Sequence, residues 1–370
     1  MQKIKQRIIE IALEVSRTQV NKATKKHLCL LRARKAELER QLEVQEKKSG
    51  ARQSGQGFAP KKHGITVGIV GFPSVGKSSM FSALTGTHSR AAEFEFTTVE
   101  CKPGSFMYED CEFTLLDLPG IIQGFSMGRG DYGRDVLAVV RTCDCIVMML
   151  DAERGEAQRE ALTRELDLAN VRLNERKPPI SVTRKTIGGV HYMSSCRQTH
   201  LDNDLVQSIL KQFNIHHADV TVNCDATPQQ LIDSISNNVS YIPCVYTFNK
   251  ADLLTMSEID RLTTLDPHNV VISATEQMGF EWLKASVWHH INYIRVFTKS
   301  PSEKYPTFHD PILLKRGSTL ADLCDKIHSS FLERFEYATI FGSSVKFSPT
   351  RKGITHELGD YDVIQIKLRT

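Results

Sequence analysis

The chain has 370 residues, more than one ordinary domain holds, so about two to four domains are expected. Its 41% hydrophobic and 24% charged residues are ordinary for a globular protein. Because the formal net charge of +4 is mild, any affinity for nucleic acid must come from local basic patches. No apolar run approaches the roughly 20 residues that span a bilayer. A membrane-embedded protein is therefore not expected.

Two further features indicate a cytosolic protein. The first residues, Met-Gln-Lys-Ile-Lys-Gln-Arg, lack the apolar core of a signal peptide. The nine cysteines are scattered and contain no Cys-x-x-Cys pair, which suits neither a zinc site nor a disulfide framework. Reduced thiols, most of them buried, are expected.

Residues 1–48 are expected to form a helical hairpin. Ile4, Ile8 and Ile11 lie on one helical stripe, and Thr24 is a suitable N-cap for a second helix. Basic residues crowd this hairpin at Lys22, Lys25, Lys26, Arg32, Arg34, Lys35 and Arg40. A solvated helical face and a contact with RNA or the ribosome explain this charge equally well. Residues 49–63, rich in Gly, Ser and Gln, are expected to be a flexible linker.

Residues 71–79, Gly-Phe-Pro-Ser-Val-Gly-Lys-Ser-Ser, fit the pattern of a phosphate-binding loop. An apolar, β-branched segment at 65–70 precedes them and a segment that can be helical follows, which is the context that the motif requires. Lys77 is expected to reach the β- and γ-phosphates, and the Ser78 hydroxyl to bind Mg²⁺. The predicted nucleotide contacts in this loop are Gly71, Pro73, Ser74, Val75, Gly76, Lys77, Ser78 and Ser79.

Two later segments are typical of switches that sense the γ-phosphate. Residues 91–98 end in two threonines, and Thr98 is preferred over Thr97 as the one that closes over the phosphate and binds Mg²⁺. A strand at 112–117 ends in Asp-x-x-Gly, which places Asp117 near Mg²⁺, through water, and the Gly120 N–H near the γ-phosphate. The glycine-rich residues 124–133 are interpreted as the second switch. The predicted catalytic contacts are Lys77, Thr98 and Gly120, and the predicted metal ligands are Ser78, Thr98 and Asp117.

The base-reading segments come last. A buried strand at 244–248 leads into Asn-Lys-Ala-Asp, whose Asp252 carboxylate can accept two hydrogen bonds from the N1–H and 2-amino groups of guanine. Adenine offers neither donor there, so such a site rejects it. Ala274 follows another strand and is expected to present its N–H to the guanine O6 atom. The predicted base contacts are Asn249, Lys250, Asp252, Ser273, Ala274 and Thr275. GTP and GDP are the predicted ligands.

These five motifs in this order resemble the guanine-nucleotide-binding family. The resemblance implies an α/β fold, a P-loop G domain with a doubly wound, mostly parallel sheet. Ras-like enzymes place a water-orienting glutamine directly after Gly120, but this chain has Ile121 there. Because an apolar side chain cannot orient water, slow intrinsic hydrolysis is expected, with the missing group supplied in cis or in trans. Ser74 stands where potassium-activated GTPases usually carry asparagine, so a K⁺ requirement stays open without support from that residue.

The chain further resembles the Obg-related GTPases through residues 117–124, Asp-Leu-Pro-Gly-Ile-Ile-Gln-Gly, and through residues 138–142. Within that group it is similar to the developmentally regulated GTP-binding proteins, the DRG family. The phosphate loop and residues 17–24, 172–174 and 362–366 carry that similarity over nearly the whole chain.

Smaller differences separate the chain from that family's pattern. Residues 148–152 and 346–349 look closer to the second of the family's two eukaryotic branches. The glycine-rich run at 128–134 is longer than the family's, and Gln123 stands where glutamate is usual. These two departures concern surfaces of the second switch that would face a partner.

The expected domains follow from these motifs. Residues 64–170 and 242–293 are assigned to the G domain. Residues 171–241 are too many for one crossover helix, so they are expected to form an inserted small α+β domain. It is expected to hold a helix near 202–213 and a second helix opened by Thr227-Pro228, an N-cap followed by proline. Residues 294–370 alternate strands and a helix near 319–331, which fits a β-grasp module like the TGS domain, expected to serve in docking.

The family resemblance implies a cytoplasmic, Mg²⁺-dependent GTPase that switches conformation on the translation machinery. It implies association with ribosomes or RNA and with a DRG-family regulatory protein, whereas no membrane and no DNA partner are expected. Two alternatives stay open. One is a GTP-stabilised scaffold with negligible hydrolysis, which Ile121 favours. The other is an RNA-binding module built on the basic hairpin and the TGS-like region.

Overall fold

The computed structural model describes residues 2–19, 21, 24–48, 64–85, 101–120, 133–300, 305–306 and 308–369. The predicted linker at 49–63, Thr98, Ile121 and most of the second switch lie outside the described residues. The chain divides into two compact units. One unit holds the described residues of 1–58, 124–133 and 163–242, and the other holds those of 59–123, 134–162 and 243–370.

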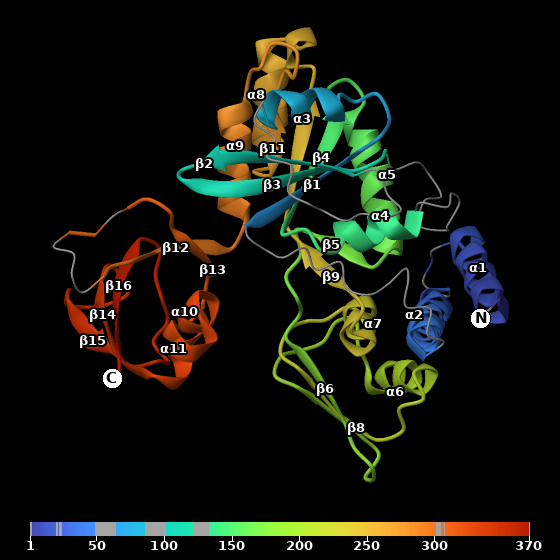
Figure 1. Ribbon diagram of the computed structural model, residues 1–370. Helices are drawn as coiled ribbons and strands as arrows, with labels where there is room; N and C mark the ends of the chain where they lie inside the picture. The colour runs from blue at the N-terminus through green and yellow to red at the C-terminus, as the bar shows by residue number, and fades with distance from the viewer. Residues whose placement is uncertain are drawn as a thin grey trace. The chain divides into compact units, whose positions relative to one another are not determined.

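A six-stranded sheet forms the centre of the second unit, with strand order β11-β10-β4-β1-β3-β2 (Figure 1). Every neighbouring pair is parallel except β2 with β3, which is antiparallel. This confirms the expected α/β fold with a mostly parallel sheet. The strands are β1 (Ile65–Gly71), β2 (Lys102–Tyr108), β3 (Cys111–Asp117), β4 (Cys145–Asp151), β10 (Cys244–Asn249) and β11 (Asn269–Val271).

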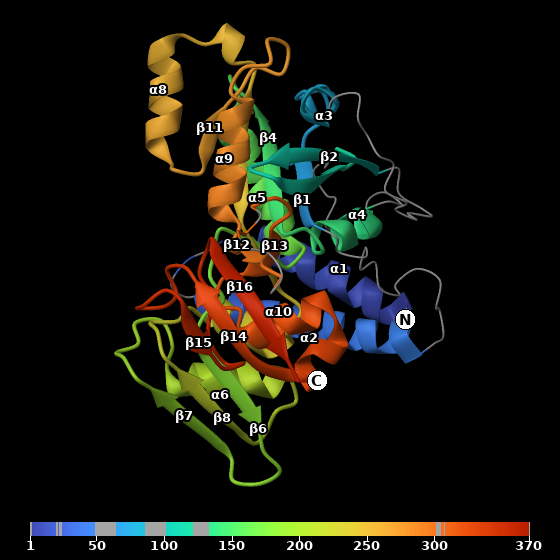
Figure 2. The same cartoon turned by 60° about the vertical axis from the view of Figure 1, so that its left-hand side comes forward.

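Helices cover this sheet because its strands are apolar on both faces: all seven residues of β1 are buried. Met80 of α3 and both Leu283 and Val287 of α9 join the core cluster that contains the β1 side chains. Figure 2 shows α9 running alongside the strands. The helices of this region are α3 (Lys77–Thr85), α4 (Gly133–Val140), α5 (Gly155–Leu168), the 3-10 helix η2 (Ala251–Leu253), α8 (Met256–Leu265) and α9 (Phe280–His290).

The C-terminal region forms a second sheet with strand order β13-β12-β16-β14-β15. Only β12 and β16 pair in parallel. The helix predicted at 319–331 is in fact two helices, because His328 adopts an extended backbone (φ −167°, ψ 136°) and its side chain caps the second one. The elements are β12 (Tyr293–Thr298), β13 (Ile312–Lys315), α10 (Leu320–Ile327), α11 (Ser329–Glu333), β14 (Phe335–Phe341), β15 (Thr350–Lys352) and β16 (Asp362–Leu368).

Arg295 of β12 ties this second sheet to the first. Its guanidinium donates to both carboxylate oxygens of Asp360, at 3.2 and 2.7 Å, and pairs with Glu109 in the turn between β2 and β3. It also lies over the rings of Trp288 and Tyr361, at 4.6 and 4.1 Å from their centroids. The side chain is only 6% exposed. A buried charge with this many partners positions the turn and both sheets together.

The first unit combines the N-terminal helices with the insertion. Cys29 and Ala33 of α2 lie in the same core cluster as Phe213 and Leu231 of the insertion. Sequence patterns predicted both insertion helices, and Thr227 caps the second with a capping box ahead of Pro228, as expected. The elements are α1 (Gln2–Arg17), α2 (Lys25–Lys48), β5 (Val171–Leu173), β6 (Ile180–Arg184), β7 (Val190–Ser194), α6 (Asn203–Gln212), β8 (Ala218–Val222), α7 (Pro228–Ser236) and β9 (Ser240–Ile242).

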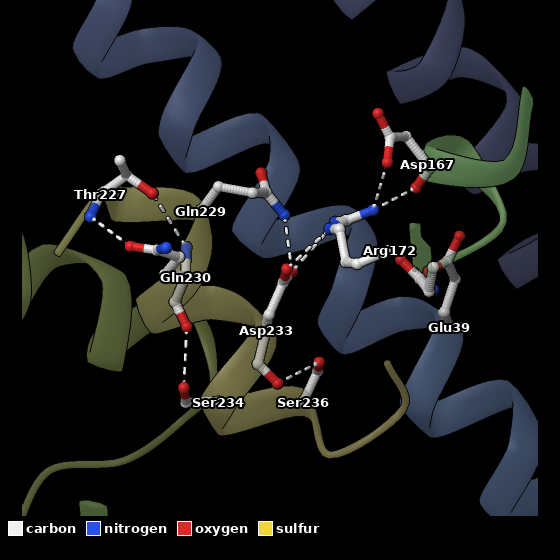
Figure 3. Close-up of polar contacts among 10 residues, drawn as sticks. Glu39, Asp167, Arg172, Thr227, Gln229, Gln230, Asp233, Ser234 and Ser236 are labelled. Atoms are coloured by element: carbon white, nitrogen blue, oxygen red, sulfur yellow. Dashed lines mark hydrogen bonds and ion pairs between the residues drawn. The ribbon is translucent and has the colours of Figure 1, made fainter. Parts of the chain in front are cut away.

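A buried ion pair joins the elements of this unit (Figure 3). Arg172 of β5 donates to both oxygens of Asp233 in α7, at 3.0 and 3.2 Å, and to the backbone carbonyl of Asp167 at 2.8 Å. Gln229 supplies a further donor to Asp233 at 2.8 Å. Burial raises the pKa of Asp167, and the neighbouring Arg172 opposes that shift. Arg172 thereby connects α7 of the insertion to the end of α5.

Among the residues that the structure describes, no helix is both long enough and apolar enough to cross a membrane.

Candidate nucleotide-binding site

The phosphate loop lies between β1 and α3, as its sequence context predicts. At two positions of this loop only glycine fits, because a side chain would collide with neighbouring atoms. A Cβ at Gly71 would lie 2.6 Å from the carbonyl oxygen of Met149, and one at Gly76 would lie 2.3 Å from Nδ2 of Asn249. Gly76 also has a φ of +93°, which side chains disfavour. The loop is therefore closely packed against the ends of β4 and β10.

Lys77 begins α3 and is partly buried. Its ammonium donates to the carbonyl oxygens of Gly71 and Phe72, at 3.2 and 2.9 Å. Burial lowers the pKa of Lys77, while the negative charge of Asp117 opposes that shift. The loop's own carbonyls thus hold the ammonium, and phosphate oxygens would compete with them for it.

Ser78 and Asp117 meet although they are far apart in the sequence. Ser78 Oγ donates to Asp117 Oδ2 at 3.0 Å. The other carboxylate oxygen, Oδ1, is buried and has no hydrogen-bond partner among the described residues. A buried acceptor without a partner is costly, so an unsatisfied one points to a missing ion or water. A hydroxyl beside a carboxylate is the oxygen-ligand set that Mg²⁺ uses with phosphates. These two residues therefore fit a Mg²⁺ ion.

Gly120 lies against the phosphate loop. A Cβ at Gly120 would lie 3.2 Å from the ring of Pro73. The Asp-x-x-Gly turn and the phosphate loop are thus adjacent, as the sequence order predicts. Thr98, the third predicted metal ligand and catalytic contact, lies outside the described residues and stays a prediction.

The base side of the site consists of the loops at residues 249–252 and 273–275, and hydrogen bonds within the protein hold these loops. Ser273 Oγ donates to Asp252 Oδ1 at 2.6 Å, and Thr275 Oγ1 lies 3.0 Å from the same hydroxyl. This hydrogen bond from Ser273 is the main reason that the pKa of Asp252 is lowered, so the carboxylate stays an acceptor. Ser273 is fully buried whereas Asp252 is exposed. Ser273 thus orients the Asp252 carboxylate, which is the predicted acceptor for guanine.

Asn249 connects the base side to the phosphate side. Its Nδ2 donates to the carbonyl oxygen of Val75 at 2.9 Å, and its Oδ1 accepts from the Ala274 N–H at 3.0 Å. The Ala274 N–H therefore has a partner within the protein in this structure, and its predicted hydrogen bond to guanine O6 stays a prediction. The local motif could not reveal this, because the acceptor comes from a segment 25 residues away.

One contact of the base-reading motif was missed by sequence reasoning. The Lys250 ammonium lies 2.5 Å from Oδ2 of Asp151, the last residue of β4. Strands β4 and β10 are parallel neighbours whose register pairs Asp151 with Asn249. The sequence signal for this contact was Asp151 itself, an acidic residue at the end of β4, the strand that pairs with β10.

The fold and this site define a P-loop GTPase: a phosphate loop, an Asp-x-x-Gly turn and base-side loops follow the strands of a mostly parallel sheet. Residues 66–185 match the family model described as 50S ribosome-binding GTPase. Residues 187–293 match the C-terminal region of the MMR_HSR1 domain, and residues 294–368 match the TGS domain.

The chain belongs to the developmentally regulated GTP-binding protein family. It is 43% identical to developmentally-regulated GTP-binding protein 2 homolog of Dictyostelium discoideum, over 98% of this chain and 99% of that protein. It is also 43% identical to developmentally-regulated GTP-binding protein 1 of Xenopus laevis, over 97% and 98% of the two chains. These equal identities do not separate the two branches. A solved structure, the GTP binding protein from Pyrococcus horikoshii OT3, is 16% identical with a TM-score of 0.41, covering 82% of this chain and all of that one.

Proposed function

We propose that this GTPase is a Mg²⁺-dependent, cytoplasmic switch that acts on the translation machinery. The observation that carries the metal requirement is the buried Oδ1 of Asp117, which lies beside the Ser78 hydroxyl and has no partner in the part of the chain that the structure describes. Mg²⁺, when bound there, supplies positive charge that neutralises the phosphates. Thr98 completes the proposed ligand set, and no K⁺ requirement is proposed.

The chain's own groups carry the rest of the proposed hydrolysis. Lys77 exchanges its carbonyl partners for phosphate oxygens, because an ionised acceptor binds an ammonium more strongly than a neutral carbonyl. The Gly120 N–H faces the γ-phosphate, and water attacks that phosphorus in line with the leaving oxygen. Asn249, Lys250, Asp252 and the 273–275 loop select guanine. Positioning supplies most of the catalysis.

Slow hydrolysis without a partner is part of this proposal. Ile121, at the position of the water-orienting glutamine in Ras-like enzymes, offers no hydrogen-bonding group. A cation or a partner must then orient the water or stabilise the developing charge.

The proposed partners are the ribosome or its RNA and a DRG-family regulatory protein. The matched family models describe a ribosome-binding GTPase and a TGS domain. The surface of α2 adds support, because Lys25, Lys26, Arg32 and Arg34 are exposed whereas Cys29 and Ala33 are buried against the insertion. A cationic helix face of this kind attracts phosphate.

The test is GTP turnover by the purified protein, alone and with ribosomes, in potassium and in sodium buffers. Strong stimulation by ribosomes is expected, because they would supply the missing catalytic group or position the second switch. Chelation of Mg²⁺ should abolish turnover. A rate that ribosomes leave unchanged would contradict the switch on translation.

Two alternative functions have a specific observation in their favour. Ile121 favours a GTP-stabilised scaffold, for which turnover should stay below about 10⁻⁴ s⁻¹ with every partner present.

The exposed basic residues of α2 favour an RNA-binding module. Deleting residues 1–48 would uncover the core that α2 shares with the insertion, so charge reversal at Lys25, Lys26 and Arg32 is the better test. An RNA-binding module predicts lost RNA binding, unchanged GTP affinity and a steep salt dependence.

A further inference from the structure

Asp151 forms an ion pair with the lysine of the base-reading motif, and its other contacts hold it in place. Oδ2 of Asp151 accepts from the Lys250 ammonium at 2.5 Å, and Oδ1 accepts from the Glu153 N–H at 3.1 Å. The Asp151 N–H donates to the side-chain oxygen of Gln158 in α5 at 2.9 Å. Both carboxylate oxygens and the backbone N–H are therefore used, which leaves the side chain little freedom.

The neighbouring backbone ties Asp151 to the strand that carries the motif. Asp151 and Asn249 are register partners in β4 and β10, and the Ala152 N–H donates to the Asn249 carbonyl at 3.1 Å. Gly155 lies so close to β10 that a Cβ there would come within 2.3 Å of the Phe248 ring. The start of α5 and the end of β10 thus hold the carboxylate at one place beside Lys250.

Lys250 is in a backbone conformation that needs support. Its φ of +72° lies in the left-handed region, which costs a non-glycine residue energy and persists only when the surroundings enforce it. Lys250 opens the turn that carries Asp252: the Leu253 N–H donates to the Lys250 carbonyl at 3.1 Å, and the Ala251 N–H to the Ile272 carbonyl at 3.0 Å. Whatever fixes Lys250 therefore also fixes the position of Asp252.

The hydrogen bond between Asp151 and Lys250 outweighs the other charges around this pair, which act in both directions. Hydrogen bonding to Lys250 is the main cause of the lowered pKa of Asp151, and the same bond raises the pKa of Lys250. Glu153 adds negative charge near the ammonium and Arg154 adds positive charge, both without a hydrogen bond to Lys250. The side chain of Asp151 is 17% exposed and that of Lys250 is 41% exposed, so the pair is screened only in part.

We propose that Asp151 is a positioning residue for guanine selection: it holds Lys250, and through it the turn bearing Asp252, in the geometry that binds the base. This inference rests on the proposed base-reading role of residues 249–252. It adds to that role an acidic residue from a different strand, which acts through Lys250 without touching the base.

A double-mutant cycle with the full chain tests whether Asp151 acts through Lys250. Asp151→Asn should weaken binding of a fluorescent GDP analogue about fivefold in the wild-type background, as for a partly exposed ion pair. In a Lys250→Met background, which keeps a stem of similar length without the charge, the same change should alter affinity less than about twofold. Equal losses in both backgrounds would overturn the proposal.

Controls separate positioning from a general effect on folding. Glu153→Gln removes a nearby negative charge that forms no hydrogen bond with Lys250, so it should leave GDP affinity unchanged within about twofold. Asp151→Glu restores the carboxylate and should recover part of the affinity that Asp151→Asn loses. If Asp151 only supports α5, Asp151→Asn will lower the melting temperature and the cycle will show additive losses, which contradicts the proposal.

A parallel measurement distinguishes failure of this inference from failure of the base-reading assignment. Competition by ITP, which lacks the 2-amino group, measures base selection directly. Asp151→Asn should reduce the preference for GTP over ITP, and Asp252→Asn should reduce it more. If Asp252→Asn leaves the preference intact, the assignment of the base loop is wrong. If only Asp252→Asn reduces it, the assignment stands and the role of Asp151 is wrong.

Discussion

The base side and the phosphate side of the site differ in how complete they are without a ligand. On the base side, Asn249 accepts from Ala274 and Asp252 accepts from Ser273. On the phosphate side, Lys77 is bonded to its own loop, and Asp117 Oδ1 has no partner among the described residues. The base side is thus assembled by the protein, whereas the phosphate side is completed by what binds there.

This difference has a functional reason. Guanine is the same in GTP and GDP, so a preorganised base side lowers the cost of binding either nucleotide. A switch must distinguish the γ-phosphate, and a ligand shifts a conformational equilibrium only through contacts that differ between two states. Groups on the phosphate side such as Asp117 Oδ1, which has no partner within the described ranges, are suited to make such contacts.

Lys77→Ala should give the largest effect, because it removes a charged donor from the phosphate side. We expect GTP turnover to fall about 1,000-fold, as when a single donor to the transition state is lost. The melting temperature should change little, since the hydrogen bonds of the ammonium to described residues go to two loop carbonyls. Lys284→Ala, which removes a lysine paired with Glu281 on α9, is the matched control and should turn over normally. Normal turnover by Lys77→Ala would refute the phosphate-loop assignment.

Gly76→Ala should damage both sides at once, because Gly76 lies against Asn249. The added Cβ would lie 2.3 Å from Asn249 Nδ2 at a φ of +93°. The strain at this φ should lower stability, and the clash must displace the phosphate loop from its place, so we expect roughly 100-fold weaker binding of GDP, measured by titration calorimetry.

The control for that change is Gly188→Ala. Gly188 has a similar φ of +111° but lies in the insertion, where the nearest described atom to an added Cβ is His191 Nε2 at 3.9 Å. It should lose stability without losing nucleotide affinity. If both variants bind GDP equally well, the contact between the loop and Asn249 has no role in binding.

Asp252→Asn should change which base binds while leaving the phosphate side intact. An amide donates where the carboxylate accepts, so the preference should move from GTP toward XTP, whose 2-position carries an acceptor. We expect the preference for GTP to fall by at least about tenfold in competition binding. Retention of the original preference would show that another group reads the base.

Ser273→Ala should give the smallest effect. It removes the hydrogen bond that orients Asp252, at 2.6 Å, but leaves the carboxylate in place. A lost hydrogen bond of this kind predicts about threefold weaker GDP binding. Ser257→Ala, at an exposed serine near Thr255 on α8, should have no effect. An effect as large as that of Asp252→Asn would mean that Ser273 contacts the nucleotide directly.

Local patterns were sufficient for much of this protein. Strand 65–70, the phosphate loop and its following helix were predicted together, because an apolar β-branched run followed by Gly-x-x-x-x-Gly-Lys-Ser encodes all three within 20 residues or so. Thr227-Pro228 marked the start of α7 for the same reason: a cap acts on the next turn of chain. The helix predicted at 319–331 was too long, because the extended backbone of His328 divides it into α10 and α11.

The sequence by itself determined the family, the fold class and the order of the motifs. Only the tertiary structure decided that Asn249 spans the two sides of the site, that the Ala274 N–H is already used, that Asp151 holds Lys250 and that α2 shares a core with the insertion. The reason is physical. A motif specifies backbone shape over a few residues, whereas these contacts depend on strand order and register, which join residues 99 and 174 positions apart.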